Sequence, residues 1–282
     1  MKVLKGLFFF LCIALLVSTV PADAKTINFA VVSDVHYTVI TDNDNKKYSN
    51  AAKALHGFVD RANENDYDFV IFLGDNIDKS KPQNLKGFLN IIRHIDTPYY
   101  LVMGNNDVHK IGGMSKDEYL KIVSENNRYQ RKTKGSYYFC PTNDVIVIVL
   151  DGVSSGMPSS HGIFNEKTLK WLDSVLEKNK NKKAVIFQHV PYREPFYSPD
   201  KEILDKNEYA AVIRRYDNII MICSGHYHKE FAQKDDRDVY HVSAPALYEP
   251  PYYYLDMQVK YDKLPFAKAK NFKIDGNAKP AI

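Results

Sequence analysis

Seven side chains of the metal-ligand type stand out in this sequence, and most of them directly follow a short apolar run. The run at residues 69–73, which precedes Asp75, is typical of a buried strand. Because ligands bind outside the carboxyl ends of strands in α/β sheets, side chains that follow several strands can meet at one place. Imidazoles, carboxylates and one amide gathered there would suit a pair of divalent metal ions. The seven residues are Asp34, His36, Asp75, Asn105, His189, His226 and His228.

The local spacing of these residues also favours joint binding. Asp34 and His36 are two residues apart, as are His226 and His228. In an extended segment, residues two apart face the same side, so each pair can act together. Glycines that permit tight turns and close backbone approach stand immediately before three of the predicted ligands. They are Gly74, Gly104 and Gly225.

The blocks that carry these residues resemble, in order, those of the calcineurin-like metallophosphoesterase family, which read D-x-H, G-D, G-N-H-[DE], H and G-H-x-H. They run here from Asp34 to His228, and the sequence looks most similar to the bacterial phosphodiesterase branch. The resemblance implies an α/β fold in which two mixed β-sheets pack face to face with helices outside, a four-layer metallophosphoesterase sandwich. One block departs from the pattern, because Asn106 stands where most relatives carry His.

The resemblance also implies a role for each predicted ligand. Asp75 matches the carboxylate that bridges two divalent ions, and a metal-bound hydroxide would attack the phosphate ester. A mixed imidazole and oxygen shell suits manganese, iron or zinc. By the same resemblance, Asp34, His36 and His228 complete one site, and Asn105, His189 and His226 complete the other.

Asn106 is the informative departure. In typical relatives, the His at this position donates a proton to the leaving oxygen or orients it. Asparagine can donate a hydrogen bond but cannot supply a proton near neutral pH. General acid catalysis contributes about 10²–10⁴-fold, and its loss matters most for a poor leaving group. The sequence therefore favours diesters, or other substrates whose leaving group needs little protonation.

Other side chains are candidates for catalysis or substrate binding. His161 follows a strand end and could act as a substitute acid, although a surface loop histidine is the alternative; His109 is a weaker candidate. Arg193, with Tyr192 and Tyr197, could bind a substrate phosphate or stack on a base, and loop packing is the alternative there. Asn105 is also a candidate substrate contact.

The apolar periodicity predicts alternating strands and helices in the first half, hence right-handed βαβ units and a largely parallel sheet. A hairpin over residues 136–150 then opens a second half. We find no repeat or obvious linker, so residues 25–282 are predicted to form one domain. Helices are expected at 50–65, 83–95, 115–125, 167–179 and 208–216, and strands at 27–32, 69–73, 99–103, 136–140, 145–150, 184–188, 231–233, 239–243 and 252–259, with a further strand ending at Gly225.

Residues 1–24 read as a secretory signal peptide, with cleavage expected after Ala24. Lys2 and Lys5 precede an uncharged run over residues 7–20, and Ala22-Asp23-Ala24 follows. The run of 14 residues is shorter than the roughly 17–25 that span a bilayer. We therefore expect a secreted or periplasmic protein with no stable membrane span after processing; an uncleaved anchor is the alternative.

The net charge and the cysteine content limit the classes of binding partner that we expect. The net charge of +4 is too mild to indicate a nucleic-acid-binding patch, so the expected partner is a small-molecule or polymeric phosphate ester. Cys223 lies in an apolar run and is expected to be a buried free thiol. These observations predict an exported metal-dependent phosphoesterase, a phosphodiesterase rather than a monoesterase. The alternatives are a catalytically weakened metal- or phosphate-binding protein of the same fold, and a phosphomonoesterase.

Overall fold

The computed structural model describes residues 25–39, 50–109, 112–131, 133–154 and 159–261, together with the backbone of residues 266–273. The predicted signal peptide lies outside these residues. Among the helices of the described residues, none combines the length and the apolar character that crossing a membrane requires.

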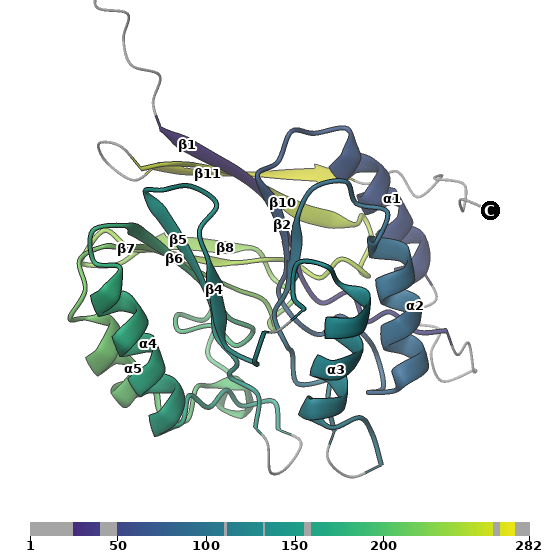
Figure 1. The fold of residues 1–282 in the computed structure, drawn as a ribbon, viewed down its shortest axis with the longest axis horizontal. Coiled ribbons are helices and arrows are strands. Elements are labelled where there is room, and N and C mark those ends of the chain that lie inside the picture. The colour runs from purple at the N-terminus through teal and green to yellow at the C-terminus, as the bar shows by residue number, and fades with distance from the viewer. Residues whose placement is uncertain are drawn as a thin grey trace, which may run out of the picture.

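The first sheet has five strands in the order β11-β10-β1-β2-β3. Strands β1, β2 and β3 are parallel, as the predicted crossovers require, whereas β10 runs antiparallel to both β1 and β11. Three helices accompany this sheet (Figure 1). The elements are β1 (Thr26–Val32), α1 (Ala51–Asn63), β2 (Phe69–Phe72), α2 (Pro82–Ile92), β3 (Tyr99–Leu101), α3 (Lys116–Asn126), β10 (Tyr253–Lys260) and β11 (Phe266–Lys273).

The second sheet has six strands in the order β4-β5-β6-β7-β9-β8. Its four central strands are parallel, and the two edge strands, β4 and β8, are antiparallel to their neighbours. The elements are β4 (Tyr137–Phe139), β5 (Val145–Val149), α4 (Glu166–Lys178), β6 (Lys183–Phe187), the short 3₁₀ helix η2 (Pro199–Lys201), α5 (Lys206–Ile213), β7 (Ile219–Ser224), β8 (Phe231–Lys234) and β9 (Tyr240–Ser243).

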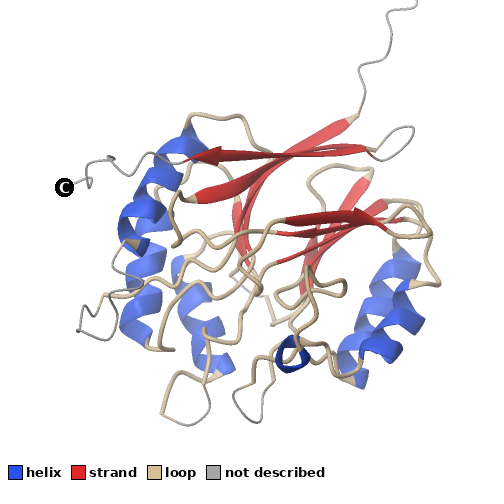
Figure 2. Ribbon diagram, turned by 180° about the vertical axis from the view of Figure 1, so that it is seen from behind, coloured by secondary structure: helices blue, strands red, loops and turns tan. Residues whose placement is uncertain are grey.

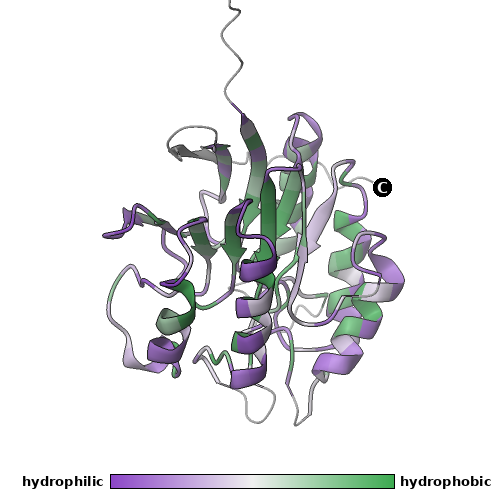
Figure 3. Ribbon diagram, turned by 60° about the vertical axis from the view of Figure 1, so that its left-hand side comes forward, coloured by the Kyte–Doolittle hydropathy of each residue, from purple (hydrophilic) through white to green (hydrophobic). Residues whose placement is uncertain are grey.

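The two sheets face one another, and the helices cover their outer faces (Figure 2). Aromatic rings fill the space between the sheets: Phe29 stacks on Phe69 with ring centroids 4.8 Å apart, and Phe187 meets Phe29 edge-on at 5.7 Å. Burying a side chain of this size contributes about 1.5–3 kcal/mol. The strands are largely apolar, and the helices alternate between apolar and polar faces (Figure 3). The predicted four-layer α/β architecture is confirmed.

The predicted helices all form, and their ends shift by no more than about three residues, as helix assignments commonly do. Caps explain two of the starts. The Ser115 side chain accepts a hydrogen bond from the Glu118 N–H at the start of α3, and Asn165 does the same for Thr168 at the start of α4. Strand β11 was not predicted, and the prediction that the last strand ends the fold near residue 259 was therefore wrong.

Candidate metal centre

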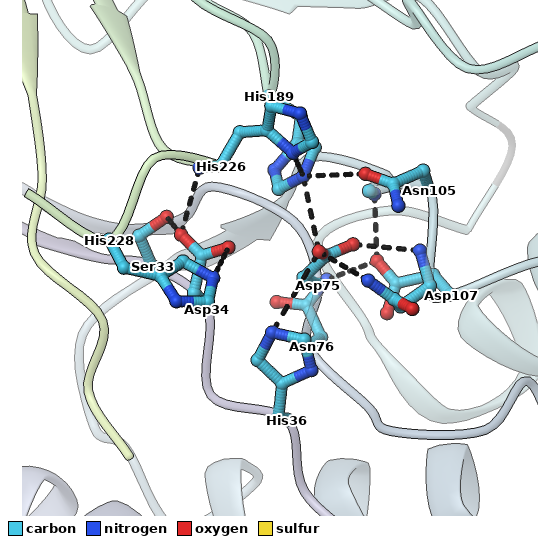
Figure 4. A network of polar contacts seen from close by, with 12 residues as sticks. Ser33, Asp34, His36, Asp75, Asn76, Asn105, Asp107, His189, His226 and His228 are labelled. Atoms are coloured by element: carbon cyan, nitrogen blue, oxygen red, sulfur yellow. Dashed lines mark hydrogen bonds and ion pairs between the residues drawn. The ribbon is translucent and has the colours of Figure 1, made fainter. Parts of the chain in front are cut away.

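The structure brings the seven predicted ligands together at the carboxyl ends of five parallel strands (Figure 4). Asp34 and His36 follow β1, and Asp75 follows β2. Asn105 follows β3, which lies beside β2 in the first sheet. The second sheet supplies His189 after β6, and His226 and His228 after β7. Each sheet therefore contributes to the same centre, and neither sheet could form it alone.

Asp34, His36 and His228 make the first candidate metal group, with one ligand atom of each residue within 4.8 Å of the others. His228 Nε2 lies 3.2 Å from Asp34 Oδ1. The other ring nitrogen, Nδ1, lies 3.2 Å from the Tyr248 hydroxyl, which donates to Glu249 Oε1 at 2.7 Å. That hydroxyl can therefore accept from Nδ1–H, an arrangement that leaves Nε2 with a lone pair directed at the centre.

Asp75, His189 and His226 make the second candidate metal group, and all three are buried. His189 Nδ1 lies 2.8 Å from the Leu73 carbonyl oxygen, so it must be the N–H that donates. The lone pair then falls on Nε2, which lies 3.4 Å from Asp75 Oδ2 and 3.2 Å from both Asn105 Oδ1 and His226 Nδ1. These nitrogen and oxygen acceptors repel one another at such distances, and a cation bound among them would remove the repulsion.

The pKa shifts at the centre also indicate a site suited to a cation. Burial lowers the pKa of His189, but the Asp75 carboxylate and the other acceptors around the ring together outweigh burial and raise that pKa to about 9. Burial, together with the charge of His189, lowers the pKa of His226 to about 3. Burial disfavours ionisation of Asp75, yet His189 and His36 hold its pKa well below the usual range. The site is thus arranged around positive charge, which protons or divalent cations can supply.

Five of the predicted ligands have backbone dihedrals in the left-handed region, which residues other than glycine rarely adopt. Their φ values lie between 47° and 69°. Each such residue costs roughly 1–2 kcal/mol, and strain of this kind persists mainly at functional sites. The strained ligands are Asp34, His36, Asp75, His226 and His228.

Two of the predicted glycines are required by close approach. A Cβ atom on Gly104 would lie 2.0 Å from the Asp75 backbone nitrogen and 2.3 Å from Asp75 Oδ1. A Cβ atom on Gly225 would lie 1.9 Å from Ser33 Oγ. The loops can bring their ligands this close only because no side chain intervenes.

Asn106 contacts the carboxylate that is predicted to bridge the metals. Its backbone N–H donates to Asp75 Oδ1 at 2.8 Å, and its side-chain Nδ2 donates to Asp75 Oδ2 at 2.7 Å. The loop is anchored by buried Asp107, which accepts from the backbone N–H groups of Gly104 at 2.8 Å and Ile77 at 3.0 Å. This anchoring role was not predicted from the sequence, although Asp107 belongs to the same block.

A cavity of about 300 Å³ adjoins this loop. His109 lines it beside Asn106, whereas His161 does not, although its neighbours Ser159 and Ser160 do. His161 is half-buried, and its backbone N–H donates to Ser159 Oγ at 3.0 Å. The role of His161 as a substitute acid stays a prediction, and unchanged kcat of His161→Ala on an alkyl diester would exclude it.

Arg193 and the neighbouring tyrosines have contacts with residues other than the seven predicted ligands. The Tyr192 ring packs against Tyr209 at 5.5 Å and against His241 at 5.6 Å. Burial and, to a lesser extent, the charge of Arg193 lower the pKa of His241, so Arg193 lies near that ring. Within the described part of the chain, Arg193 makes no hydrogen bond or ion pair with the seven ligands. Tyr197 is exposed, and substrate binding by Arg193 stays a prediction.

Comparisons with known proteins agree with this geometry. A manganese-dependent ADP-ribose/CDP-alcohol diphosphatase of Arabidopsis thaliana is 27% identical over 277 residues, which cover 79% of this chain and 87% of that protein. A probable cyclic nucleotide phosphodiesterase of Coxiella burnetii is 24% identical over an alignment that covers 78% of this chain and 83% of that protein. The crystal structure of a dimetal phosphatase from Danio rerio superposes with a TM-score of 0.70 at 18% identity, over 88% of this chain and 98% of that one.

The family model for calcineurin-like phosphoesterases matches residues 27–230, which include all seven predicted ligands. Fold, donor set and family model therefore agree. The chain belongs to the calcineurin-like phosphoesterase family and is a metallophosphoesterase.

Proposed function

We propose that this protein is an exported, metal-dependent hydrolase of phosphodiesters or diphosphates rather than of phosphomonoesters. The observation that carries the proposal is Asn106, which occupies the position of the family histidine and directs two N–H groups at Asp75. Those groups hold the carboxylate, and the amide cannot release a proton near neutral pH.

The chemistry of the leaving group explains the preference. A phosphate or aryl oxygen leaves as a stable anion, whereas an alkoxide needs a proton as it departs. General acid catalysis, which supplies that proton, contributes about 10²–10⁴-fold. An enzyme with asparagine at this position loses little on the first class of substrate and much on the second.

The donor set fits two divalent cations, and each of the two candidate groups would hold one of them. When bound, such cations would lower the pKa of water and neutralise charge on phosphoryl oxygens. The protein's own part is orientation: the Leu73 carbonyl directs His189, the Tyr248 hydroxyl directs His228, and Asn106 holds Asp75. Manganese, iron and zinc all suit the ligands, and the manganese dependence named for the Arabidopsis relative favours manganese.

The relatives support the same substrate class. The names of two of them specify hydrolysis of a diphosphate and of a cyclic phosphodiester, respectively. We therefore infer that nucleotide-type diphosphates such as ADP-ribose are the leading candidate substrates, and that a cyclic nucleotide, whose leaving group is an alkoxide, would be hydrolysed more slowly. Export rests on the leader at residues 1–24. Sequencing the mature N-terminus from the periplasm or medium should give Lys25 first; a cytoplasmic chain beginning at Met1 would contradict export.

The function can be tested with the mature chain loaded with manganese. We expect turnover of bis(4-nitrophenyl) phosphate and ADP-ribose, and kcat/KM for AMP at least about tenfold lower, because AMP must lose an alkoxide. Asn106→His should narrow this gap. Faster hydrolysis of AMP would identify a monoesterase instead.

One alternative is also consistent with Asn106: a binding protein of the same fold whose catalysis has weakened. The complete set of seven ligands counts against it, because a decayed site tends to lose its ligands too. Metal titration would detect binding in either case, so turnover is the measurement that separates them. No turnover with manganese, iron or zinc would favour the binding protein.

A further inference from the structure

The cavity beside Asn106 opens directly off the candidate metal centre. Asn105 and Asn106 line it, and the same Asn106 side chain donates to Asp75 Oδ2 at 2.7 Å. A substrate whose reacting phosphorus lies at Asp75 can therefore extend its next group into this space. The volume of about 300 Å³ is at the lower end of the roughly 300–1,000 Å³ range of small-molecule sites.

The lining of the cavity is suited to an anion. Lys79 and His109 bring nitrogen donors, and Ser159 brings a hydroxyl group. The Ser80 and Ser160 hydroxyls also line the cavity but donate to backbone carbonyls. No carboxylate is among the lining residues that the structure describes. A lysine ammonium binds phosphate as a compact point charge, and hydroxyl and amide groups can donate the remaining hydrogen bonds.

Lys79 is held in a conformation that a lysine seldom adopts. Its φ of 51° lies in the left-handed region, which it shares with five of the seven predicted ligands. The fully buried Asn84 side chain fixes this turn, because its Nδ2 donates to the carbonyl oxygens of Asp78 at 2.5 Å and Lys79 at 3.1 Å. Strain of roughly 1–2 kcal/mol at a non-glycine residue commonly marks a functional position.

The next residue secures the other side of the turn. Ser80 Oγ accepts a hydrogen bond from the Met114 backbone N–H at 2.9 Å, and the Ser80 carbonyl accepts a second one from the same N–H at 2.9 Å. The His109 backbone N–H donates to the Met114 carbonyl at 2.8 Å. Lys79 and His109 are therefore placed on the same cavity by one shared backbone frame.

We propose that this cavity is a second-phosphate subsite in which Lys79 binds the phosphoryl group next to the reacting one, so that the preferred substrate is a nucleotide-type diphosphate. The inference rests on the proposed function and narrows it. Water adds its oxygen to one phosphorus, and the bond from that phosphorus to the bridging oxygen breaks. The bridging oxygen leaves with the electron pair as part of a phosphomonoester, and the released protons go to solvent.

The test compares Lys79→Gln with Lys86→Gln, which removes the same charge from an exposed position on α2 outside the cavity. With ADP-ribose, Lys79→Gln should lower kcat/KM by about 10–100-fold, the usual worth of a hydrogen bond to a charged group. With bis(4-nitrophenyl) phosphate, which lacks a second phosphate, both variants should stay within about twofold of wild type. Lys79→Arg, which keeps the charge, should recover most of the ADP-ribose activity.

Binding supplies a readout that does not need turnover. The affinity of the manganese-loaded protein for α,β-methylene-ADP, measured by calorimetry, should fall about tenfold or more in Lys79→Gln and stay unchanged in Lys86→Gln. If Lys79→Gln leaves this affinity unchanged, or lowers activity on both substrates equally, the subsite is overturned while the proposed function stands. If wild type hydrolyses neither substrate, the proposed function fails, and the methylene analogue still decides whether the subsite exists.

Discussion

The two candidate metal groups use similar ligands in different surroundings. Asp75, His189 and His226 are all buried, and a backbone carbonyl orients His189. In the other group, the His228 side chain is 22% exposed. It is oriented by the Tyr248 hydroxyl, which in turn relies on Glu249, a side chain that is 42% exposed.

The two groups differ in how firmly the partners of their histidines are fixed. A carbonyl at the end of a sheet strand cannot rotate away from its partner, whereas a hydroxyl on a loop side chain can. Ligands whose outer partners are fixed hold a metal more tightly, and loss of one outer partner typically costs about 10–100-fold in affinity or activity. We expect the buried group to bind its cation more tightly and the group with His228 to exchange its cation more readily.

Asp75→Ala should have the largest effect, because Asp75 belongs to the buried group and its Oδ2 also lies 3.8 Å from His36 Nε2 of the other group. The loss of activity should exceed about 100-fold, since even an outer partner of a metal ligand can cost that much. Steady-state assays with bis(4-nitrophenyl) phosphate and a manganese titration of the variant measure it. Activity within tenfold of wild type would remove Asp75 from the centre.

The substitutions Gly104→Ala and Gly225→Ala test how rigid the backbone around each group is. Each adds a methyl group where the loops approach closely. A methyl on Gly104 meets the Asp75 backbone nitrogen at 2.0 Å, which cannot move without shifting the loop. A methyl on Gly225 meets side-chain atoms instead, Ser33 Oγ at 1.9 Å and Asp34 Oδ2 at 2.8 Å, which can rotate. Overpacking costs about 1–3 kcal/mol, so urea unfolding should place Gly104→Ala near the upper value and Gly225→Ala below it. The reverse order would contradict a more rigid buried group.

Tyr248→Phe isolates the outer partner of His228. Without the hydroxyl, the His228 tautomer is no longer fixed, and the weaker of two manganese-binding events should lose about tenfold in affinity. The tighter event should be unchanged, because the Leu73 carbonyl still orients His189. Calorimetric titration resolves both events, and equal weakening of the two would show that the groups are not independent.

Cysteine labelling gives the smallest expected effect and probes how closed the core beneath the centre is. Cys223 lies in β7, which leads to His226, and burial raises the pKa of its thiol to about 12. At pH 8 this thiol should stay protonated and resist iodoacetamide, whereas exposed Cys140 should react. Mass spectrometry of the mature chain, residues 25–282, labelled in its native state should find one label, at Cys140; rapid labelling of Cys223 would indicate that β7 opens.

The side chains that gather at the centre could be predicted from the sequence because each belongs to a local pattern. An apolar run predicts a strand, and a glycine followed by Asp75, Asn105 or His226 predicts a tight turn with a ligand beside it. Helix starts were equally local, since Ser115 and Asn165 cap their own helices. The face-to-face packing of the sheets was implied by the family resemblance rather than by these patterns.

The remaining features depend on tertiary contacts that local patterns do not encode. Among the described strands, β11 pairs with β10 alone, at an edge of the sheet, and its sequence alternates alanine with lysine instead of forming an apolar run. Tyr248 reaches His228 across 20 residues of chain. Lys79 is one loop lysine among many, and its backbone conformation, held by Asn84, is what distinguishes it.

We expect two cations at this centre, one in each candidate group. Anomalous diffraction at the manganese edge, on crystals of the mature protein grown with manganese, tests it most directly. Two peaks are expected, one among Asp34, His36 and His228 and the other among Asn105, His189 and His226, with Asp75 between them. A single peak, or peaks elsewhere in the molecule, would contradict it.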